Sequence, residues 1–546
     1  KTRSVWDYFL SRRQQFLNEK YEPVVDDNIK EQERLLFPRT KEVRWWSEVF
    51  GRTDAEMNGP LHGTPITFAN GLGVSVLTGA ESADKSIGIG TAHQPRTDGG
   101  LSQGAERIAA GLSALGIGKS SASQIRSRSP ESAKASTSLR LPIGYFTLGP
   151  TYCQHTPFAA ASQVYVNAWS AVKSLVSRAR ARGIGTLLDL HALPGGANGG
   201  DHSGTNSGKA QLWGDRHNLD LATRCLLFIA QEARSMDGVV GLQLCNEAEY
   251  DAIGMYAWYD SVIGQIAKID NTLPLYISDA WNLGQALSYT NGKNSLINGA
   301  ANPIIIDTHL YWAFTDADKA KTPQQIISEV SAKLSELDGK DGSVVDHGAA
   351  QVIVGEYSCV LTEDSWTKAH GADKSQLVVG FGQAQSQRYQ QRAGGSYFWT
   401  YKMDWMDGGE WGFAQQTKSN AITSPASLAL PHPDIQQRIT AATAQRDARR
   451  AAALAAHTDY WDRQDPGEYE HWRYEAGWGV GFDDAAAFLG MRASGALQGP
   501  GGDRIGMLDV WIRKRVVESG QAGRWLWEFE QGVRKGVAEF YELAGV

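Results

Sequence analysis

Two stretches of this sequence, VVGLQLCNEAEY at 239–250 and AAQVIVGEYSC at 349–359, decide the expected fold. Each contains an apolar, β-branched run that is typical of a buried strand, and a glutamate follows that run, Glu247 in the first stretch and Glu356 in the second. In a barrel of parallel strands the C-terminal strand ends meet at one face, where catalytic groups collect. We therefore expect the two glutamates to form a carboxylate pair.

Further apolar segments alternate with helical stretches on either side of these two. Together with 239–245 and 351–356, the expected strands are 139–145, 185–191, 273–279, 303–309 and 396–401. Strands that are separated by helical crossovers pair in parallel, and an eighth strand within 65–78 would close a barrel. The sequence thus predicts an α/β fold: a (β/α)8 TIM barrel with an elaborated N-terminal segment and a C-terminal helical extension.

The composition along the chain divides it into three parts. We expect a helical segment at 1–60, a catalytic barrel at 61–432 with a long Gly/Ser-rich insertion at 81–138, and a helical, aromatic-rich extension at 433–546. The aromatic residues of the extension could form a sugar-binding platform, but we expect them to pack its helices against the barrel.

The overall composition excludes several functional classes. A net charge of −7 argues against a nucleic-acid partner, and no apolar run approaches the roughly 18 residues of a membrane span. The four cysteines are expected to be free and buried, because they are too few to form a disulfide scaffold in a chain of 546 residues. Neither a signal peptide nor an Asn-x-Ser/Thr sequon is recognisable, which favours a cytoplasmic location.

Six motifs, in the right order, resemble those of glycoside hydrolase family 5, the clan A retaining β-glycosidases, and especially its fungal exo-β-1,3-glucanase-like branch. RLPIGYF at 140–146 resembles the second-strand motif RIPIGYW, and LLDLHALPGGANGGDHSG at 187–204 resembles LDLHGAPGSQNGFDNSG. The other four are LCNEAEY at 244–250, IDTHLYWAF at 306–314, VGEYS at 354–358 and SYFWTYKMD at 396–404. The resemblance covers roughly 138–413.

The resemblance implies a mechanism in which one carboxylic acid protonates the leaving oxygen while a second, ionised carboxylate attacks the anomeric carbon. It makes Glu247 the acid/base and Glu356 the nucleophile. A general acid must be protonated when substrate binds, so the pKa of Glu247 is expected above its ordinary value. Arg140 is expected to hold Glu356 in its charged form.

The same resemblance implies a set of residues around the bound sugar. Asn246 would hydrogen-bond the 2-hydroxyl group, Tyr311 would donate to the nucleophile, and Trp399 would form the apolar floor of the −1 subsite. The expected substrate-binding residues are Arg140, His191, Asn198, Asp201, Asn246, His309, Tyr311, Phe314 and Trp399. Both chemical steps run on carboxylates and water, so neither a metal nor an organic cofactor is expected.

The chain departs from the family pattern at three positions. Gly200 stands where the family has one aromatic wall of the +1 clamp, although Phe314 could supply the other wall. Ala248 replaces the proline after the Asn-Glu pair, which affects only the local backbone. The first-strand glutamate has no recognisable counterpart, because Glu81 is a poor substitute. A preference for terminal glucose and strict exo action therefore do not follow from the sequence.

The expected function is hydrolysis of β-glucosides or β-1,3-linked gluco-oligosaccharides through a covalent glycosyl-enzyme, with carbohydrate as the partner. The altered clamp also allows a β-glycosidase or transglycosidase that acts on flavonoid or lipid glycosides. Two other classes stay open: a non-catalytic carbohydrate-binding barrel, and a metal-dependent hydrolase with His191 and His309 as ligands. The resemblance implies a secreted or wall-associated location, in contrast to the cytoplasmic one favoured above.

Overall fold

The computed structural model describes residues 69–70, 72–75, 136–205, 207–296, 301–338, 344–345, 350–401, 409–464 and 467–546. The helical segment expected at 1–60, Glu81 and nearly all of the insertion expected at 81–138 lie outside these residues.

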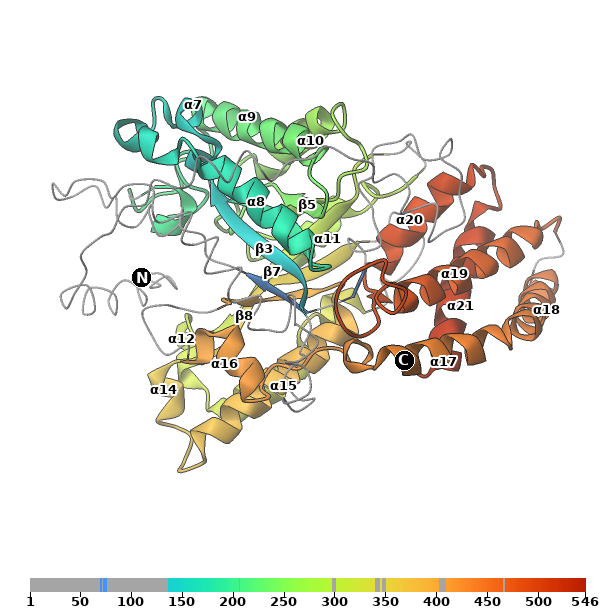
Figure 1. The fold of residues 1–546 in the computed structure, drawn as a ribbon. Coiled ribbons are helices and arrows are strands. Elements are labelled where there is room, and N and C mark those ends of the chain that lie inside the picture. The colour runs from blue at the N-terminus through green and yellow to red at the C-terminus, as the bar shows by residue number, and fades with distance from the viewer. Residues whose placement is uncertain are drawn as a thin grey trace.

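Eight parallel strands form a closed barrel in which each strand pairs with the next and the last pairs with the first (Figure 1), which confirms the predicted fold. They are β2 (Leu72–Ser75), β3 (Ser136–Gly144), β4 (Gly185–Ala192), β5 (Val239–Gln243), β6 (Leu275–Ser278), β7 (Ile304–Trp312), β8 (Gln351–Leu361) and β9 (Ser396–Trp399). The strand expected at 65–78 is divided: β2 joins the barrel, whereas β1 (Ala69–Asn70) pairs antiparallel with β10 (Arg504–Ile505) of the extension.

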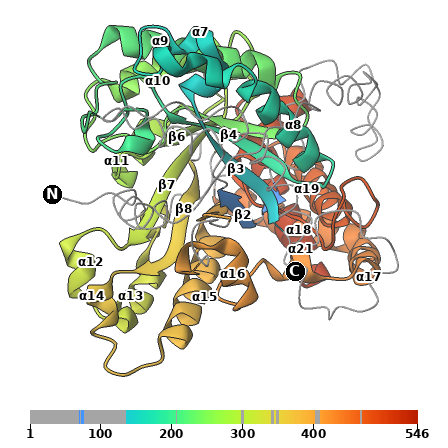
Figure 2. The ribbon, with the colours of Figure 1, turned by 60° about the vertical axis from the view of Figure 1, so that its left-hand side comes forward.

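Helices connect the strands and cover the outside of the barrel (Figure 2). They are α7 (Pro150–Cys153), α8 (Ala168–Arg180), α9 (Arg216–Ala233), α10 (Met255–Ile266), α11 (Leu283–Thr290), α12 (Asp316–Ala320), α13 (Pro323–Glu329), α14 (Glu363–Trp366), α15 (Lys374–Arg392) and α16 (Phe413–Lys418). In α9 the buried residues Leu221, Cys225 and Ile229 recur at four-residue spacing, so one stripe faces the strands. The Asp215 side chain caps this helix by accepting a hydrogen bond from the Asn218 amide.

Successive strand residues point to opposite faces and contribute to two different cores. On β4, Leu188 and Leu190 pack in the layer between strands and helices, whereas Leu187 belongs to a second core. That second core joins the lower barrel interior to the extension and includes Leu187, Tyr276, Ile305, Ile353, Tyr397, Ile505, Met507 and Trp511. The extension therefore closes the N-terminal end of the barrel, and the C-terminal end is left for the site.

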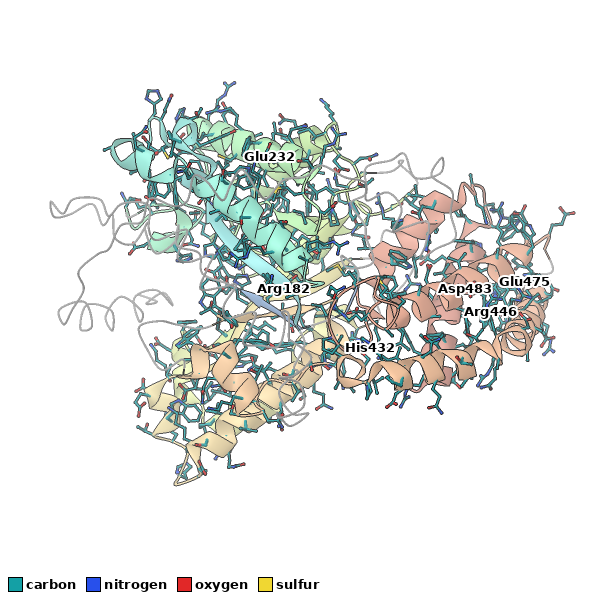
Figure 3. All side chains as sticks on the ribbon, viewed as in Figure 1. Arg182, Glu232, His432, Arg446, Glu475 and Asp483 are labelled. Atoms are coloured by element: carbon teal, nitrogen blue, oxygen red, sulfur yellow. The ribbon has the colours of Figure 1, made fainter. Side chains whose placement is uncertain are left out.

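The extension consists of α17 (His432–Thr443), α18 (Arg446–Gln464), α19 (Trp472–Gly490), α20 (Leu508–Ser519) and α21 (Leu526–Ala544). Arg446 pairs with Asp483 at 2.7 Å and ties α18 to α19 (Figure 3). Between α19 and α21 the backbones come very close, because a Cβ atom at Gly481 would lie 2.1 Å from the carbonyl oxygen of Val533. Only glycine fits at that position.

The cysteines and the helices of the described part of the chain bear on two predictions made from the sequence. All four cysteines are free and buried, as predicted. Among the described helices, none combines the length and the apolar character that crossing a membrane requires.

Candidate active site

Glu247 and Glu356 face each other at the C-terminal end of the barrel. Glu247 follows β5 and Glu356 lies within β8, near the end of the barrel wall. One oxygen of each carboxylate and a ring nitrogen of His309 all lie within 4.8 Å of one another. Retaining glycosidases place their carboxyl groups about 5–5.5 Å apart, whereas inverting enzymes leave about 6.5–9.5 Å for a water molecule. The short distance between the Glu247 and Glu356 carboxylates therefore matches the arrangement of a retaining glycosidase.

Each oxygen of the Glu356 carboxylate accepts a hydrogen bond from a different donor. Arg140 Nη1 lies 2.8 Å from Oε1, and the Tyr311 hydroxyl lies 2.8 Å from Oε2. A cation and a phenol on the two oxygens stabilise the charged form and fix its orientation. Burial together with the Glu356 charge raises the pKa of Tyr311 well above its usual value, so the phenol remains a donor.

The Arg140 guanidinium is fully buried at the centre of the site. Besides Glu356 it donates to Asn246 Oδ1 at 2.6 Å and pairs with Asp189 at 3.1 Å and Asp307 at 3.5 Å. Burial by itself lowers the pKa of Arg140, but these three carboxylates outweigh burial and raise it. Arg140 is therefore a permanent cation that organises the acidic groups around it.

The Glu247 carboxylate lies between two imidazoles. His202 Nε2 is 3.0 Å from one oxygen and His309 Nδ1 is 2.9 Å from the other. The Asn198 side chain donates to the Glu247 carbonyl oxygen at 2.7 Å, which supports a backbone with a left-handed φ of 42°.

The electrostatics of Glu247 differ from the prediction. Burial raises the pKa of Glu247, but the hydrogen bonds from His202 and His309 outweigh burial and hold it well below its usual value. Conversely, burial lowers the pKa of His309, but Glu356 and Asp307 raise it well above the usual value. The expected upward shift of the Glu247 pKa is thus wrong for the substrate-free site, because the hydrogen bonds from the two imidazoles favour its charged form.

Asn246 is oriented from both ends of its amide. Its oxygen accepts from Arg140, and its nitrogen lies 3.3 Å from His191 Nε2. Burial lowers the pKa of His191, and the ring is held by Asp189 Oδ2, 2.8 Å from Nδ1. The Trp399 ring stacks on His191 with 5.7 Å between centroids and an angle of 14°. Trp399 and His191 together therefore support one side of the site.

Two predicted substrate-binding residues lie at the edge of this network. Phe314 contacts the Tyr311 ring edge-on, with 5.4 Å between ring centroids. Asp201 begins the short 3₁₀ helix η6 (Asp201–Ser203) and is exposed. The next residue, His202, is the one that contacts Glu247. The structure therefore brings the predicted residues together with the exception of Asp201.

His202 was not among the predicted residues, although it lies in one of the quoted motifs. It occupies the position of the asparagine in the family's FDNSG, and Gly200 occupies that of the phenylalanine. A Cβ atom at Gly200 would lie 2.5 Å from Cε1 of His202. The His202 ring therefore fits in this position because residue 200 has no side chain. Both residues differ from the family motif, and these two differences together were the available sequence signal for His202.

A buried polar layer beneath the glutamates was also missed. Gln243 accepts from Arg140 Nε at 3.0 Å and donates to Asp307 Oδ2 at 2.5 Å. Asp307, His309 and Tyr311 alternate along β7, so all three face the barrel interior. A Cβ atom at Gly355 would lie 1.8 Å from Asp307 Oδ1, which explains the glycine before Glu356. In the sequence, the alternation of polar residues in IDTHLYW was the signal that could have indicated this layer.

Trp281 is a third feature of the site that sequence reasoning missed. It follows β6, is 50% exposed, and its ring meets that of His309 edge-on with 6.3 Å between centroids. The exposed indole of Trp281, next to the buried His309, offers an apolar surface at the entrance of the site. Its loop position carries no periodic sequence signal.

The two histidines proposed as metal ligands do not converge on one point. His191 is bonded to Asp189 and Asn246, whereas His309 faces Glu247, Asp307 and Glu356. At this end of the barrel, among the described residues, Glu247, His309 and Glu356 lie close enough together to hold an ion. Arg140 and Tyr311 already donate hydrogen bonds to the two oxygens of Glu356. An ion at this position would have to compete with the Arg140 guanidinium for the carboxylate.

A closed (β/α)8 barrel with a close carboxylate pair at its C-terminal face defines a retaining β-glycosidase. An uncharacterised glycosyl hydrolase of Saccharomyces cerevisiae is 30% identical over 416 residues, spanning 74% of this chain and 75% of that protein. Glucan 1,3-beta-glucosidase 3 of Schizosaccharomyces pombe is 29% identical over 402 residues, spanning 72% of this chain and 78% of that protein. The chain belongs to glycoside hydrolase family 5.

Residues 442–544 match the family model described as the glucan 1,3-beta-glucosidase 3 C-terminal domain. Among solved structures, rutinosidase from Aspergillus niger is similar with a TM-score of 0.43 and 14% identity, covering 65% of this chain and 99% of that one. An endoglucanase of Pseudomonas stutzeri has a TM-score of 0.40 and 14% identity, covering 64% of this chain and 93% of that one.

Proposed function

We propose that the chain hydrolyses β-glucosides or β-1,3-linked gluco-oligosaccharides, with Glu356 as the nucleophile and Glu247 as the acid/base. The observation that carries this assignment is the asymmetry of the pair. Glu356 is hydrogen-bonded to a permanent cation, Arg140, and to the Tyr311 hydroxyl, whereas Glu247 is hydrogen-bonded to two imidazoles, those of His202 and His309. A nucleophile must stay charged and an acid/base must gain and lose a proton.

The reaction then takes two steps. In the first, a Glu356 oxygen attacks the anomeric carbon, the bond to the leaving oxygen breaks, and Glu247 gives that oxygen a proton. The product is a glycosyl ester on Glu356 and a free alcohol. In the second step Glu247 takes a proton from water as the water oxygen attacks the anomeric carbon, which releases the sugar with its original configuration and restores the Glu356 carboxylate.

The proton for the first step comes from the pair that Glu247 forms with His309. In the substrate-free site burial lowers the pKa of His309, but Glu356 and Asp307 more than offset burial and raise it, and Nδ1 of the ring lies 2.9 Å from the Glu247 oxygen. A bound sugar that shields Glu356 removes part of the negative charge that favours the imidazolium. A proton can then move to Glu247, the group that we propose as the acid for the leaving oxygen.

The sugar itself would be recognised by groups of fixed orientation. The Asn246 nitrogen lies on the side of the amide away from Arg140 and would donate to the 2-hydroxyl group, a contact that strengthens in the transition state. Trp281 and Phe314 offer aromatic surfaces for the next sugar unit or for an aglycone. The proposed β-1,3-linked substrate follows the name of the Schizosaccharomyces pombe relative, glucan 1,3-beta-glucosidase 3.

The test is an activity panel of aryl β-glycosides of glucose, galactose, mannose and xylose together with β-1,3-linked gluco-oligosaccharides. We expect turnover of the glucosides by wild type and by Glu249→Gln, a matched control at an exposed glutamate two residues beyond the acid/base. Glu356→Gln should lose at least about 10⁴-fold in kcat. Activity that survives Glu356→Gln would refute the assignment of the nucleophile. Turnover of another glycoside in place of glucosides would refute the substrate.

A further inference from the structure

Two histidines and a glutamate from separate segments meet inside the C-terminal extension. His457 lies on α18, His471 in the turn before α19, and Glu528 in the first turn of α21. One ligand atom from each of these residues, here called the extension triad, lies within 4.8 Å of the other two. The extension closes the N-terminal end of the barrel, so the triad is remote from Glu356 and the glycosidase mechanism does not use it.

Both imidazoles point at the same oxygen of Glu528. His457 Nε2 lies 3.1 Å and His471 Nδ1 lies 2.8 Å from Oε2. The other oxygen accepts a hydrogen bond from the Glu470 amide at 2.9 Å. Glu528 is fully buried, and in the described part of the chain no lysine or arginine pairs with it. Buried charges are paired or coordinate metal ions, and here two imidazole nitrogens converge on one carboxylate oxygen.

Neighbouring side chains hold both imidazole rings in place. Asp462 lies 3.2 Å from Nε2 of His471, and a proton on that nitrogen leaves the Nδ1 lone pair directed at the triad. The His457 ring stacks on Tyr474 at 3.8 Å between centroids and 15° between planes.

We propose that the extension triad binds a divalent transition-metal ion, and that zinc suits it best. Two imidazole nitrogens and one carboxylate oxygen form an established zinc ligand set, in which a water molecule takes the fourth position. Bonds of about 2.0–2.2 Å in a tetrahedron place the ligand atoms roughly 3.3 Å apart. The observed 3.1 Å and 2.8 Å separations therefore need only small outward movements of the two rings.

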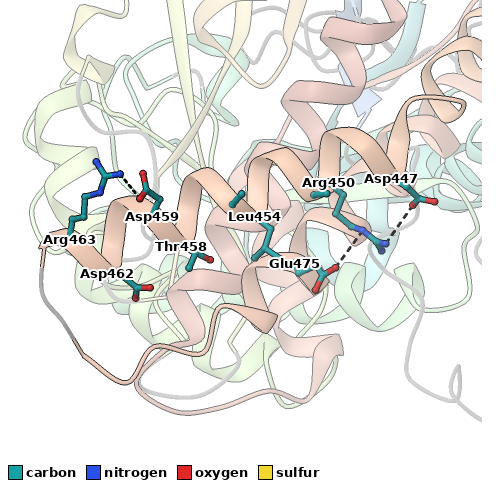
Figure 4. A pocket seen from close by; sticks show the side chains of 10 residues that line it. Asp447, Arg450, Leu454, Thr458, Asp459, Asp462, Arg463 and Glu475 are labelled. Carbon is teal, nitrogen blue, oxygen red and sulfur yellow. Dashed lines mark hydrogen bonds and ion pairs between the residues drawn. The ribbon is translucent and has the colours of Figure 1, made fainter.

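The ion would join three helices at the outer side of the extension. Asp462, which orients His471, also lines a shallow hollow along α18 with Thr458, Asp459 and Arg463 (Figure 4). The His471 side chain is 18% exposed, whereas that of Glu528 is fully buried, so the ion enters from the His471 side. Once bound it links α18, the start of α19 and α21.

The experiment measures zinc bound to the full chain after chelator treatment, dialysis and addition of zinc sulfate, by titration calorimetry and by elemental analysis. We expect one zinc per chain in wild type. His457→Gln should abolish that binding, and Asp462→Asn, an exposed change that leaves the three ligands intact, should weaken it roughly 10- to 100-fold. Addition of zinc should raise the Tm of wild type but not that of His457→Gln. Replacement by cobalt should give the visible bands of a tetrahedral site in wild type alone.

Two controls keep the outcome decisive. His217→Gln removes a histidine outside the triad and should bind zinc like wild type. Glu356→Gln tests the alternative ion site at Glu247, His309 and Glu356. Zinc that is lost with Glu356→Gln but kept in His457→Gln would overturn the proposal, as would the absence of zinc binding by folded wild type. If His457→Gln does not fold, the affinity of Asp462→Asn decides: unchanged affinity would contradict the triad.

Discussion

His309 Nδ1 lies 2.9 Å from Oε1 of Glu247, so an imidazole is hydrogen-bonded to the acid/base in the substrate-free site. Burial lowers the pKa of His309 while Glu356 and Asp307 raise it well above its usual value. The same contact, with that of His202, holds the pKa of Glu247 down despite burial. In this account the imidazole stores the proton that Glu247 delivers.

The first prediction concerns the pH dependence of kcat/KM, which reports the free enzyme. In wild type the proton on His309 is lost as pH rises through the raised pKa of that imidazole. In His309→Gln the proton must reside on Glu247 itself, whose pKa His202 still lowers. The basic limb of the profile should therefore move at least about one unit toward lower pH. An unchanged basic limb in an active His309→Gln enzyme would show that the proton is not stored there.

The second prediction is a double-mutant cycle on Gly200 and His202. A Cβ atom at Gly200 would lie 2.5 Å from the His202 ring, so Gly200→Ala should push that ring away from Glu247 and lower kcat/KM about tenfold, or about 1.4 kcal/mol. In the His202→Asn background the shorter side chain removes the clash, and Gly200→Ala should cost little. Strict additivity of the two changes would contradict the coupling.

The third prediction concerns the aromatic entrance. Trp281 is half exposed beside His309, and we expect Trp281→Ala to raise KM for β-1,3-linked oligosaccharides roughly 2- to 10-fold, because an aromatic contact contributes about 0.5–1.5 kcal/mol. Tyr460→Ala, an exposed aromatic change in the extension, serves as the control. Equal effects on KM from both variants would mean that Trp281 has no particular contact with the substrate.

The fourth prediction concerns stability of the extension. Gly481→Ala places a methyl group 2.1 Å from the Val533 carbonyl oxygen and should lower the free energy of unfolding by about 1–3 kcal/mol. Gly479→Ala, on the same helix, meets only the end of the flexible Arg446 side chain at 3.4 Å and should stabilise by about 0.5–1 kcal/mol. Denaturant unfolding checks both. Equal destabilisation by the two substitutions would contradict the close contact of α19 with α21.

The barrel and the positions of its two glutamates could be predicted because strand ends in a parallel barrel share one face. Arg140, His309 and Tyr311 followed from the same reasoning together with the family motifs. The pKa of Glu247 could not be predicted, since it depends on where two imidazoles lie. His202 is 45 residues away in the sequence, and its ring reaches Glu247 through a short 3₁₀ helix that has no periodic pattern.

Trp281 and the extension triad were missed for a related reason. Trp281 lies in a loop, where the hydrophobic periodicity of a strand (2 residues) or of a helix (3.6 residues) gives no information about which side chains face the site. His457, His471 and Glu528 are up to 71 residues apart and converge only because α19 and α21 pack together through glycines. Spacing along the chain therefore gave no metal-ligand motif.

The most direct test of the central claim is to trap the covalent intermediate. A 2-deoxy-2-fluoro-β-glucosyl donor with a good leaving group slows the second step more than the first, so the glycosyl-enzyme accumulates and mass spectrometry of its peptides locates the sugar. We expect one fluoroglucosyl group per chain, bound to Glu356, and none on the Glu356→Gln variant. A label on any other residue, or steady turnover of glucosides without a label, would contradict it.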